Sequence, residues 1–185
     1  MSDESSAGRL ALLRATITVV ARGGLRALTY RAVAAEAGVS HGLVRHHFGT
    51  RDQLIADALD YAVEASLRAS SMFDDVTDAA GFAVGIDTLA QRDGDVQAFQ
   101  YELLLESRRR PELRPVVARY YDAYRAANAA ALHRIGVQDD ALIDAIWFAL
   151  DGLVFRQVVL AEDASAVLER IRTLVRDAVT ATPHA

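Results

Sequence analysis

Basic and imidazole side chains gather in one short stretch near the start of the chain, at His41, Arg45, His46, His47 and Arg51. Guanidinium groups donate to phosphate oxygens or to the edge of guanine, and imidazoles donate to or accept from base edges according to their protonation. A metal site is the alternative, but the three histidines do not share one helical face, and no acid or cysteine completes a ligand set. We therefore expect recognition of nucleic acid here and no metal.

The elements that must position these side chains are two short helices in residues 29–48. Thr29 is a good N-cap for the first helix, and Gly38 can take the left-handed backbone that ends it. Ser40 is then expected to cap a second helix over residues 41–47. This layout is typical of a helix-turn-helix, whose second helix enters the major groove of DNA.

The rest of the chain also reads as helix, because alanine and leucine are abundant, apolar residues recur at helical spacing and there are only three prolines. We predict an all-α fold: an N-terminal three-helix DNA-binding domain over residues 6–66 and a larger helical domain over 67–185. About nine helices are expected, at residues 9–22, 29–37, 41–47, 51–70, 82–90, 96–109, 112–135, 139–161 and 164–181.

The net charge of −5 is unevenly distributed along the 185 residues. Residues 8–51 contain seven arginines and one acidic residue, whereas residues 52–185 contain thirteen arginines and twenty-two acidic residues. A positive block on an acidic body suits a protein that touches phosphate with one end only, although chance variation of surface charge is the alternative. The absence of cysteine, of a secretory signal and of an uncharged apolar span predicts a cytoplasmic protein with no membrane contact.

The helix expected at residues 139–161 is apolar on nearly every side. Such a helix needs more packing partners than one small domain supplies. We therefore predict a homodimer in which this helix and the last helix of each chain form a four-helix interface. The alternative is a central helix wrapped entirely by its own chain.

Aromatic residues gather in the second half of the chain, where a helical bundle could enclose a small molecule. Polar atoms on inward faces need partners, so the acids Glu102 and Asp151 are candidates for contact with a ligand. The candidate ligand-binding residues are Phe99, Glu102, Tyr120, Tyr124, Trp147 and Asp151. Ordinary core packing is the alternative for each aromatic residue. No catalytic constellation or phosphate-binding glycine loop is present, so we expect neither an enzyme nor a cofactor.

The segment LTYRAVAAEAGVSHGLVRHHFGTRDQL, preceded by a helix that ends in two glycines, resembles the TetR family of transcriptional regulators. The resemblance is specific over about residues 8–60 and weaker beyond, where the phrase ALDGLVF occurs in many members. It implies a homodimer whose N-terminal modules bind a palindromic double-stranded operator and whose second domain binds an unknown small-molecule effector. A repressor released by that effector is the expected function; an activator and a helical interaction protein are the alternatives.

The resemblance places phosphate contacts at Thr29, His47 and Arg51, with base contacts on the exposed face of the second helix. Arg45 stands where members most often have a tyrosine, so it is expected to bind phosphate or to reach a guanine edge. Leu43 replaces a small hydroxyl residue, which favours contact with a thymine methyl or a shorter reach. The full predicted DNA-binding set is Thr29, Tyr30, Arg31, Ser40, His41, Gly42, Leu43, Arg45, His46, His47 and Arg51.

Overall fold

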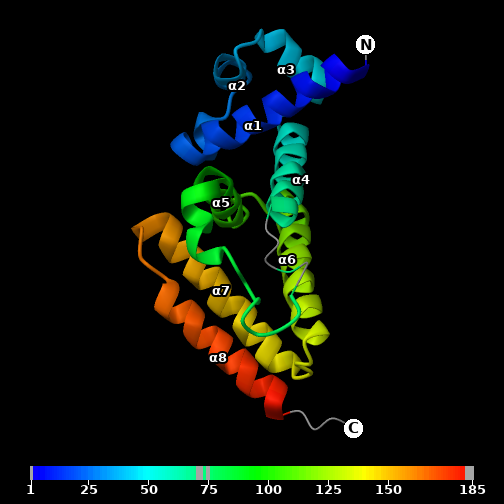
Figure 1. Ribbon diagram of the computed structural model, residues 1–185. Helices are drawn as coiled ribbons and strands as arrows, with labels where there is room; N and C mark the ends of the chain where they lie inside the picture. The colour runs from blue at the N-terminus through cyan, green and yellow to red at the C-terminus, as the bar shows by residue number, and fades with distance from the viewer. Residues whose placement is uncertain (1, 70–72, 74–75, 182–185) are drawn as a thin grey trace. The chain divides into compact units, whose positions relative to one another are not determined.

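The structure, a computed structural model, describes residues 2–69, 73 and 76–181 (Figure 1). In these residues the regular secondary structure is entirely helical, which confirms the all-α prediction. The α-helices are α1 (Ser2–Ala27), α2 (Tyr30–Ala37), α3 (His41–Phe48), α4 (Arg51–Ala69), α5 (Leu89–Glu106), α6 (Arg114–Arg134), α7 (Asp140–Leu160) and α8 (Ser165–Ala181). Two short 3₁₀ helices, Ile86–Thr88 and Pro111–Leu113, precede α5 and α6.

The helices form two compact units that do not follow a single cut in the sequence. The first unit comprises residues 1–65 and 95–120, and the second comprises residues 66–94 and 121–185. Residues 95–120, which we assigned to the second domain on sequence grounds, therefore pack with the N-terminal helices. The first unit thus contains α1, α2 and α3 together with most of α4 and α5.

The core of the first unit is built from the inward faces of its amphipathic helices. Burying these aliphatic and aromatic side chains is the main term that holds the short helices α2 and α3, because helices of that length are marginal alone. The fully or almost fully buried residues are Leu12, Leu13, Ile17, Val33, Val44, Phe48, Leu54, Ile55 and Leu59.

Helix α1 is interrupted near its end at Gly24, as the glycine pair in the sequence predicts. Gly24 has φ 70° and ψ 173°, a backbone conformation that residues with a Cβ rarely adopt. The chain turns there, and Leu25 and Leu28 then pack into the core at 3% and 2% exposure.

The caps of the helix-turn-helix agree with the sequence at two positions of three. The Thr29 hydroxyl accepts a hydrogen bond from the Ala32 N–H at 3.1 Å, and Gly38 takes a left-handed conformation with φ 68°. Ser40 occupies the N-cap position of α3, but its side chain makes no capping hydrogen bond. The expected hydroxyl cap is therefore absent, and only the Ser40 carbonyl joins the helix, through the Leu43 N–H.

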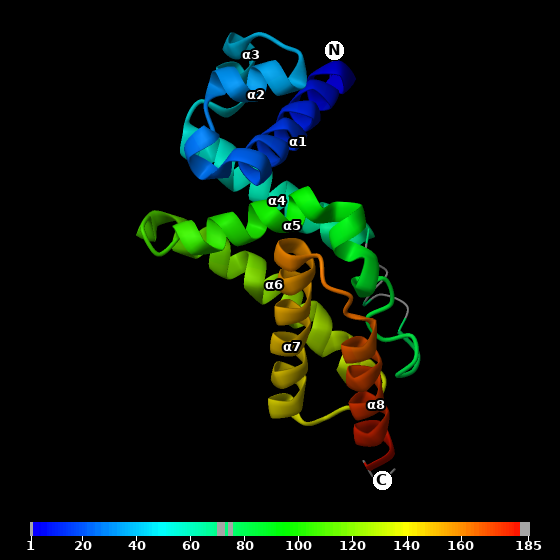
Figure 2. The same cartoon turned by 90° about the vertical axis from the view of Figure 1, so that its left-hand side faces the viewer.

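In the second unit, α7 and α8 lie side by side, and they are joined by a short connection (Figures 1 and 2). With most of α6 and the segment that leads into α5, they enclose a second core. Its most deeply buried members are Phe82, Leu132, Ile143, Leu150, Leu168 and Val175.

The helix predicted for residues 82–90 is wrong, which leaves eight α-helices among the described residues rather than nine. Ala83 and Gly85 have φ of 54° and 84°, so the chain cannot be α-helical there. Residues 91–95, which the predicted helices left out, are also helical, since α5 runs through them with only a local distortion at Asp93.

No helix among the described residues combines the length and the hydropathy that a membrane span requires.

The contrast between Thr29 and Ser40 gives a matched test of helix capping. Thr29→Ala removes the bond to the Ala32 N–H and should lower the free energy of unfolding by about 1 kcal/mol. Ser40→Ala removes a hydroxyl that caps nothing, so it should change that free energy by less than about 0.5 kcal/mol. Urea unfolding followed by circular dichroism measures both, and equal losses would contradict the structure.

Candidate nucleic-acid interface and ligand site

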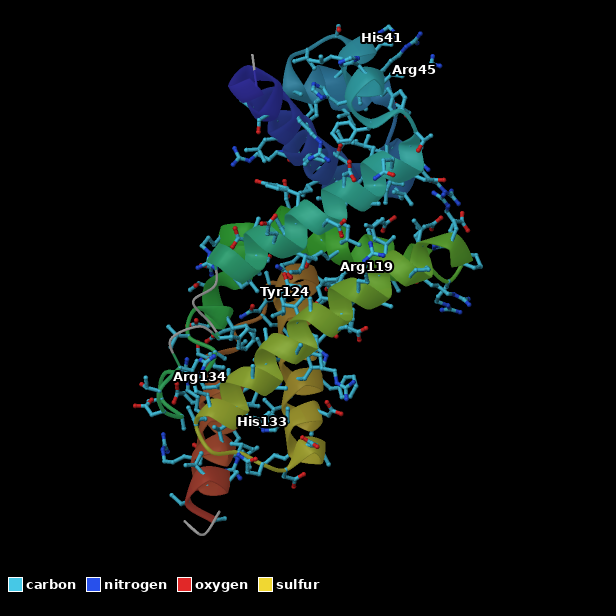
Figure 3. The ribbon with its side chains drawn as sticks, turned by 90° about the vertical axis from the view of Figure 1, so that its right-hand side faces the viewer. His41, Arg45, Arg119, Tyr124, His133 and Arg134 are labelled. Carbon is cyan, nitrogen blue, oxygen red and sulfur yellow. The ribbon has the colours of Figure 1, made fainter. Side chains whose placement is uncertain are left out.

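Helix α3 has one buried face and one face open to solvent. Val44 and Phe48 are 0% and 4% exposed and anchor the helix in the first unit. His41, Arg45 and His46 are exposed, and Figure 3 shows the side chains of His41 and Arg45 extending away from the helices beneath them. The donors predicted to contact DNA thus lie together on the free face.

Gly42 and Leu43 complete this face near the start of α3. A Cβ at Gly42 would meet only the Ser40 hydroxyl oxygen, at 3.9 Å, so nothing in the protein itself requires a glycine there. A glycine inside a helix costs about 1 kcal/mol relative to alanine. The glycine at position 42 leaves room for another molecule to approach the helix closely. Leu43 is half-buried, so only part of its side chain is available for contact.

The flanking residues of the predicted set divide between exposed groups and groups that hold α3 in place. Thr29 and Arg31, at the start of α2, are exposed. The Tyr30 hydroxyl donates to the Gly49 carbonyl at 2.9 Å and so ties the start of α2 to the end of α3. His47 is half-buried, and its ring lies 6.1 Å from the ring of Phe48.

Part of the positive block seen in the sequence is already paired with other side chains of the same unit. Arg9 pairs with Asp57 at 2.6 Å, and its guanidinium carbon lies 5.2 Å from the centre of the Phe48 ring. Arg14 donates to the Tyr61 hydroxyl at 2.9 Å. The charge that can face a phosphate is therefore smaller than the arginine count suggests.

Arg51 is also engaged with the protein, at the first residue of α4. Its Nε donates to the Leu28 carbonyl at 3.2 Å, and its Nη2 donates to the Leu25 carbonyl at 2.6 Å. These two bonds direct the guanidinium toward the protein, so a phosphate contact from Arg51 would have to use its other N–H groups.

The six candidate ligand residues do not form one group. Phe99, Glu102 and Tyr120 belong to the first unit, whereas the other three belong to the second. Phe99 is fully buried, and Glu102 accepts a hydrogen bond from the Leu25 N–H at 3.0 Å. The structure thus gives Glu102 a backbone partner that the sequence did not suggest.

Tyr124, Trp147 and Asp151 come together in the second unit, with Tyr121 as a fourth member. The Tyr124 and Trp147 rings are stacked at 6.1 Å, and the Tyr121 ring meets Trp147 edge-on at 6.0 Å. The Tyr121 hydroxyl donates to Asp151 at 2.8 Å. Burial, followed by the charge and the hydrogen bond of Asp151, raises the pKa of Tyr121, which stays protonated at neutral pH. We call these four residues the aromatic cluster.

Sequence reasoning missed Tyr121 because Tyr120 and Tyr124 have the stronger core spacing. The signal that could have found it is its position, three residues before Tyr124, which places both on one side of α6. Tyr124 is labelled on α6 in Figure 3. One turn further along, Asn128 is fully buried and donates to the Ile143 carbonyl at 3.3 Å. Among the described residues its Oδ1 has no hydrogen-bond partner, which is unusual for a buried amide.

Two family models match the chain, one on each side of residues 59–73. The family model described as "Bacterial regulatory proteins, tetR family" matches residues 12–58. The model described as "Tetracyclin repressor-like, C-terminal domain" matches residues 74–181, more than half of the chain.

The chain belongs to the TetR family. The resemblance seen in the helix-turn-helix is confirmed. The family consists of bacterial regulatory proteins, which supports a regulatory rather than an enzymatic assignment.

Individual relatives are similar either in the N-terminal module or along the whole fold. An HTH-type transcriptional repressor of Mycobacterium tuberculosis is 45% identical over 51 residues, which is 28% of this chain and 27% of the repressor. The chain thus aligns with only about a quarter of the length of that curated relative. A TetR-family structure from Streptomyces coelicolor A3 is 30% identical with a TM-score of 0.73, covering 92% of this chain and 96% of its own.

A third relative is known with a bound molecule. The multidrug binding protein EbrR, whose structure was solved in complex with ethidium, is 29% identical with a TM-score of 0.65. The match covers 91% of this chain and 98% of EbrR.

Arg45 provides the test of the exposed face of α3. Arg45→Ala should weaken DNA binding and should lower the slope of log affinity against log salt concentration by about one ion, because one phosphate contact is lost. Fluorescence anisotropy at several salt concentrations measures this slope. Arg176→Ala, which removes an exposed arginine from α8, is the control and should leave the slope unchanged. A loss of affinity at constant slope would instead indicate a base contact.

Proposed function

We propose that this protein is a dimeric repressor that leaves a palindromic operator when a small molecule binds to its second unit. The observation that carries the proposal is the exposed face of α3, where His41, Arg45 and His46 project from a helix-turn-helix whose other face is buried. The dimensions of the major groove suit one such helix. The name of the Mycobacterium tuberculosis relative supports repression rather than activation.

The proposed DNA contacts divide by role. Arg45 and Arg31 supply phosphate attraction that is sensitive to salt and blind to sequence. His41 and His46 contact base edges, and Gly42 allows the helix to approach closely. Tyr30 contributes indirectly, because its bond to the Gly49 carbonyl fixes the end of α3.

Pairing of two protomers through α7 and α8 is supported by apolar side chains that point into solvent. On α7, Phe148 is 65% exposed and Val159 is 56% exposed. On α8, Val167 is 54% exposed. Phe148, Phe155 and Val159 recur at helical spacing and so share one face of α7. Burying this face in a second copy removes it from water and gives the two recognition helices the symmetry of a palindrome.

The proposed effector is an organic cation that binds at the aromatic cluster. The π faces of tyrosine and tryptophan attract cations electrostatically, and the Asp151 carboxyl group belongs to the same cluster as Tyr124 and Trp147. The unpartnered Oδ1 of Asn128 is a further acceptor along the same side of α6. The complex of EbrR with ethidium, itself an organic cation, supports this class of ligand.

Two assays test the function, and neither requires the operator sequence to be known. Selection from a random duplex library should yield a palindromic sequence, which we call the selected duplex. Tetraphenylphosphonium, an organic cation, should quench the fluorescence of Trp147, the single tryptophan, and should release the protein from the selected duplex. Tetraphenylborate has the same shape and the opposite charge and serves as the control. If no duplex is enriched, the proposed DNA recognition is wrong.

Asp151→Asn tests the charge at the aromatic cluster. The change keeps an acceptor for the Tyr121 hydroxyl but removes the negative charge, so it should weaken binding of tetraphenylphosphonium by about tenfold or more. Affinity for the selected duplex without the cation should stay within about twofold. Unchanged quenching of Trp147 in this variant would place the cation elsewhere.

Phe148→Glu tests the proposed dimer. Because Phe148 is 65% exposed in the single chain, the variant should fold normally, yet it should sediment as a monomer and bind the selected duplex at least tenfold more weakly. Glu162→Ala, outside the apolar face, is the control for sedimentation. A variant that remains dimeric would show that the two chains meet through another surface.

A further inference from the structure

Both backbone polar groups of Leu25, the N–H and the carbonyl, are bound by side chains from two other helices. Its N–H donates to the Glu102 carboxylate of α5 at 3.0 Å. Its carbonyl accepts from Arg51 Nη2 of α4 at 2.6 Å. All three residues belong to the first unit, and we call this arrangement the Leu25 clamp.

The clamp lies where the chain leaves α1 for the helix-turn-helix. Gly24, just before it, has φ 70°, so the N–H of Leu25 has turned away from the carbonyls of α1 and needs another acceptor. Leu25 is only 3% exposed, and water therefore has little access to its peptide. Arg51 also binds the Leu28 carbonyl at 3.2 Å, immediately before the cap of α2.

Glu102 approaches this turn closely, at a position whose backbone favours glycine. A Cβ added at Gly24 would lie 3.1 Å from Glu102 Oε1, in addition to the strain of its left-handed backbone. A second connection joins α4 to the segment that follows α5, since Arg110 donates to Asp52, the neighbour of Arg51, at 2.8 Å.

We propose that Glu102 and Arg51 are positioning residues for operator recognition, because the Leu25 clamp fixes the direction in which α2 and α3 leave α1. DNA is contacted by α3, whereas the clamp determines where α3 lies relative to α4 and α5. This assigns Arg51 a role inside the protein in place of a phosphate contact, and it assigns Glu102 to the DNA-binding unit in place of the effector site.

A positioning role predicts that specific DNA binding weakens more than non-specific DNA binding. Specific binding needs α3 in one orientation, whereas non-specific attraction to phosphates tolerates several orientations. Loosening the clamp should therefore weaken binding to the selected duplex far more than binding to a random duplex. Because no phosphate contact is removed, the salt dependence of DNA affinity should be the same as in the wild type.

Glu102 is tested with three variants on one helix. Glu102→Ala removes the acceptor and should weaken binding to the selected duplex by about tenfold, at unchanged salt slope. Glu102→Gln keeps an amide oxygen for the Leu25 N–H and should stay within about threefold of the wild type. Glu106→Ala, one turn further along, removes only a surface pair with Arg109 and should have no effect. Equal binding by Glu102→Ala and the wild type would overturn the proposal.

Arg51→Met tests, independently of Glu102, whether Arg51 positions the helices or contacts a phosphate. A positioning residue predicts weaker binding to the selected duplex with the full salt slope, whereas a phosphate contact predicts a slope reduced by about one ion, as for Arg45→Ala. A reduced slope would overturn the proposal for Arg51.

Hydrogen exchange checks the clamp without DNA: the Leu25 amide should exchange faster in Glu102→Ala while amides in the middle of α1 keep their protection. An unchanged rate at Leu25 would also overturn it.

The clamp rests on the proposed DNA recognition, and the two can fail separately. Failure of the wild-type protein to enrich any duplex would reject the function. Enrichment by the wild type together with unaltered binding by the Glu102 and Arg51 variants would reject the clamp alone.

Discussion

The structure of the recognition module depends on satisfying backbone polar groups at several helix ends that follow one another closely. Each helix leaves unpaired N–H groups at its start and unpaired carbonyls at its end, and a buried unpaired group is costly. Thr29 serves the start of α2, and Gly38 allows the backbone turn at its end. Arg51 serves the carbonyls of Leu25 and Leu28, of which the first also accepts from the Leu28 N–H at 3.3 Å. With these groups paired, the short helices can bury their apolar faces in one core.

How far the sequence predicts this fold depends on whether the deciding interaction is local. The Thr29 cap, the Gly24 turn and the left-handed Gly38 follow from residue type and from neighbours within a few positions, and all three are confirmed. The buried face of α3 follows from helical spacing in the same way. Ser40 differs because the residue type allows a cap without requiring its side chain to make one.

The errors and omissions come from interactions between distant parts of the chain. Glu102 and Leu25 are 77 residues apart, and no spacing rule connects them. The helix expected at residues 82–90 fails because Ala83 adopts a left-handed backbone, which its residue type alone argues against. Tertiary contacts hold the residues next to Ala83, such as the hydrogen bond that Arg172 Nε donates to the Phe82 carbonyl at 3.0 Å. The candidate ligand residues likewise divided between two units that a linear boundary did not separate.

The exposed apolar face of α7 has a consequence for how steeply the protein would respond to its own abundance. Where protomers are mostly separate, the amount of paired protein grows with the square of their concentration, by mass action. A palindromic site that accepts only pairs would then fill over a narrow range of protein levels. In the proposed dimer, the hydrophobic side chains of Phe148 and Val159 would in this way set a threshold in gene expression, although neither belongs to the proposed DNA-binding face of α3.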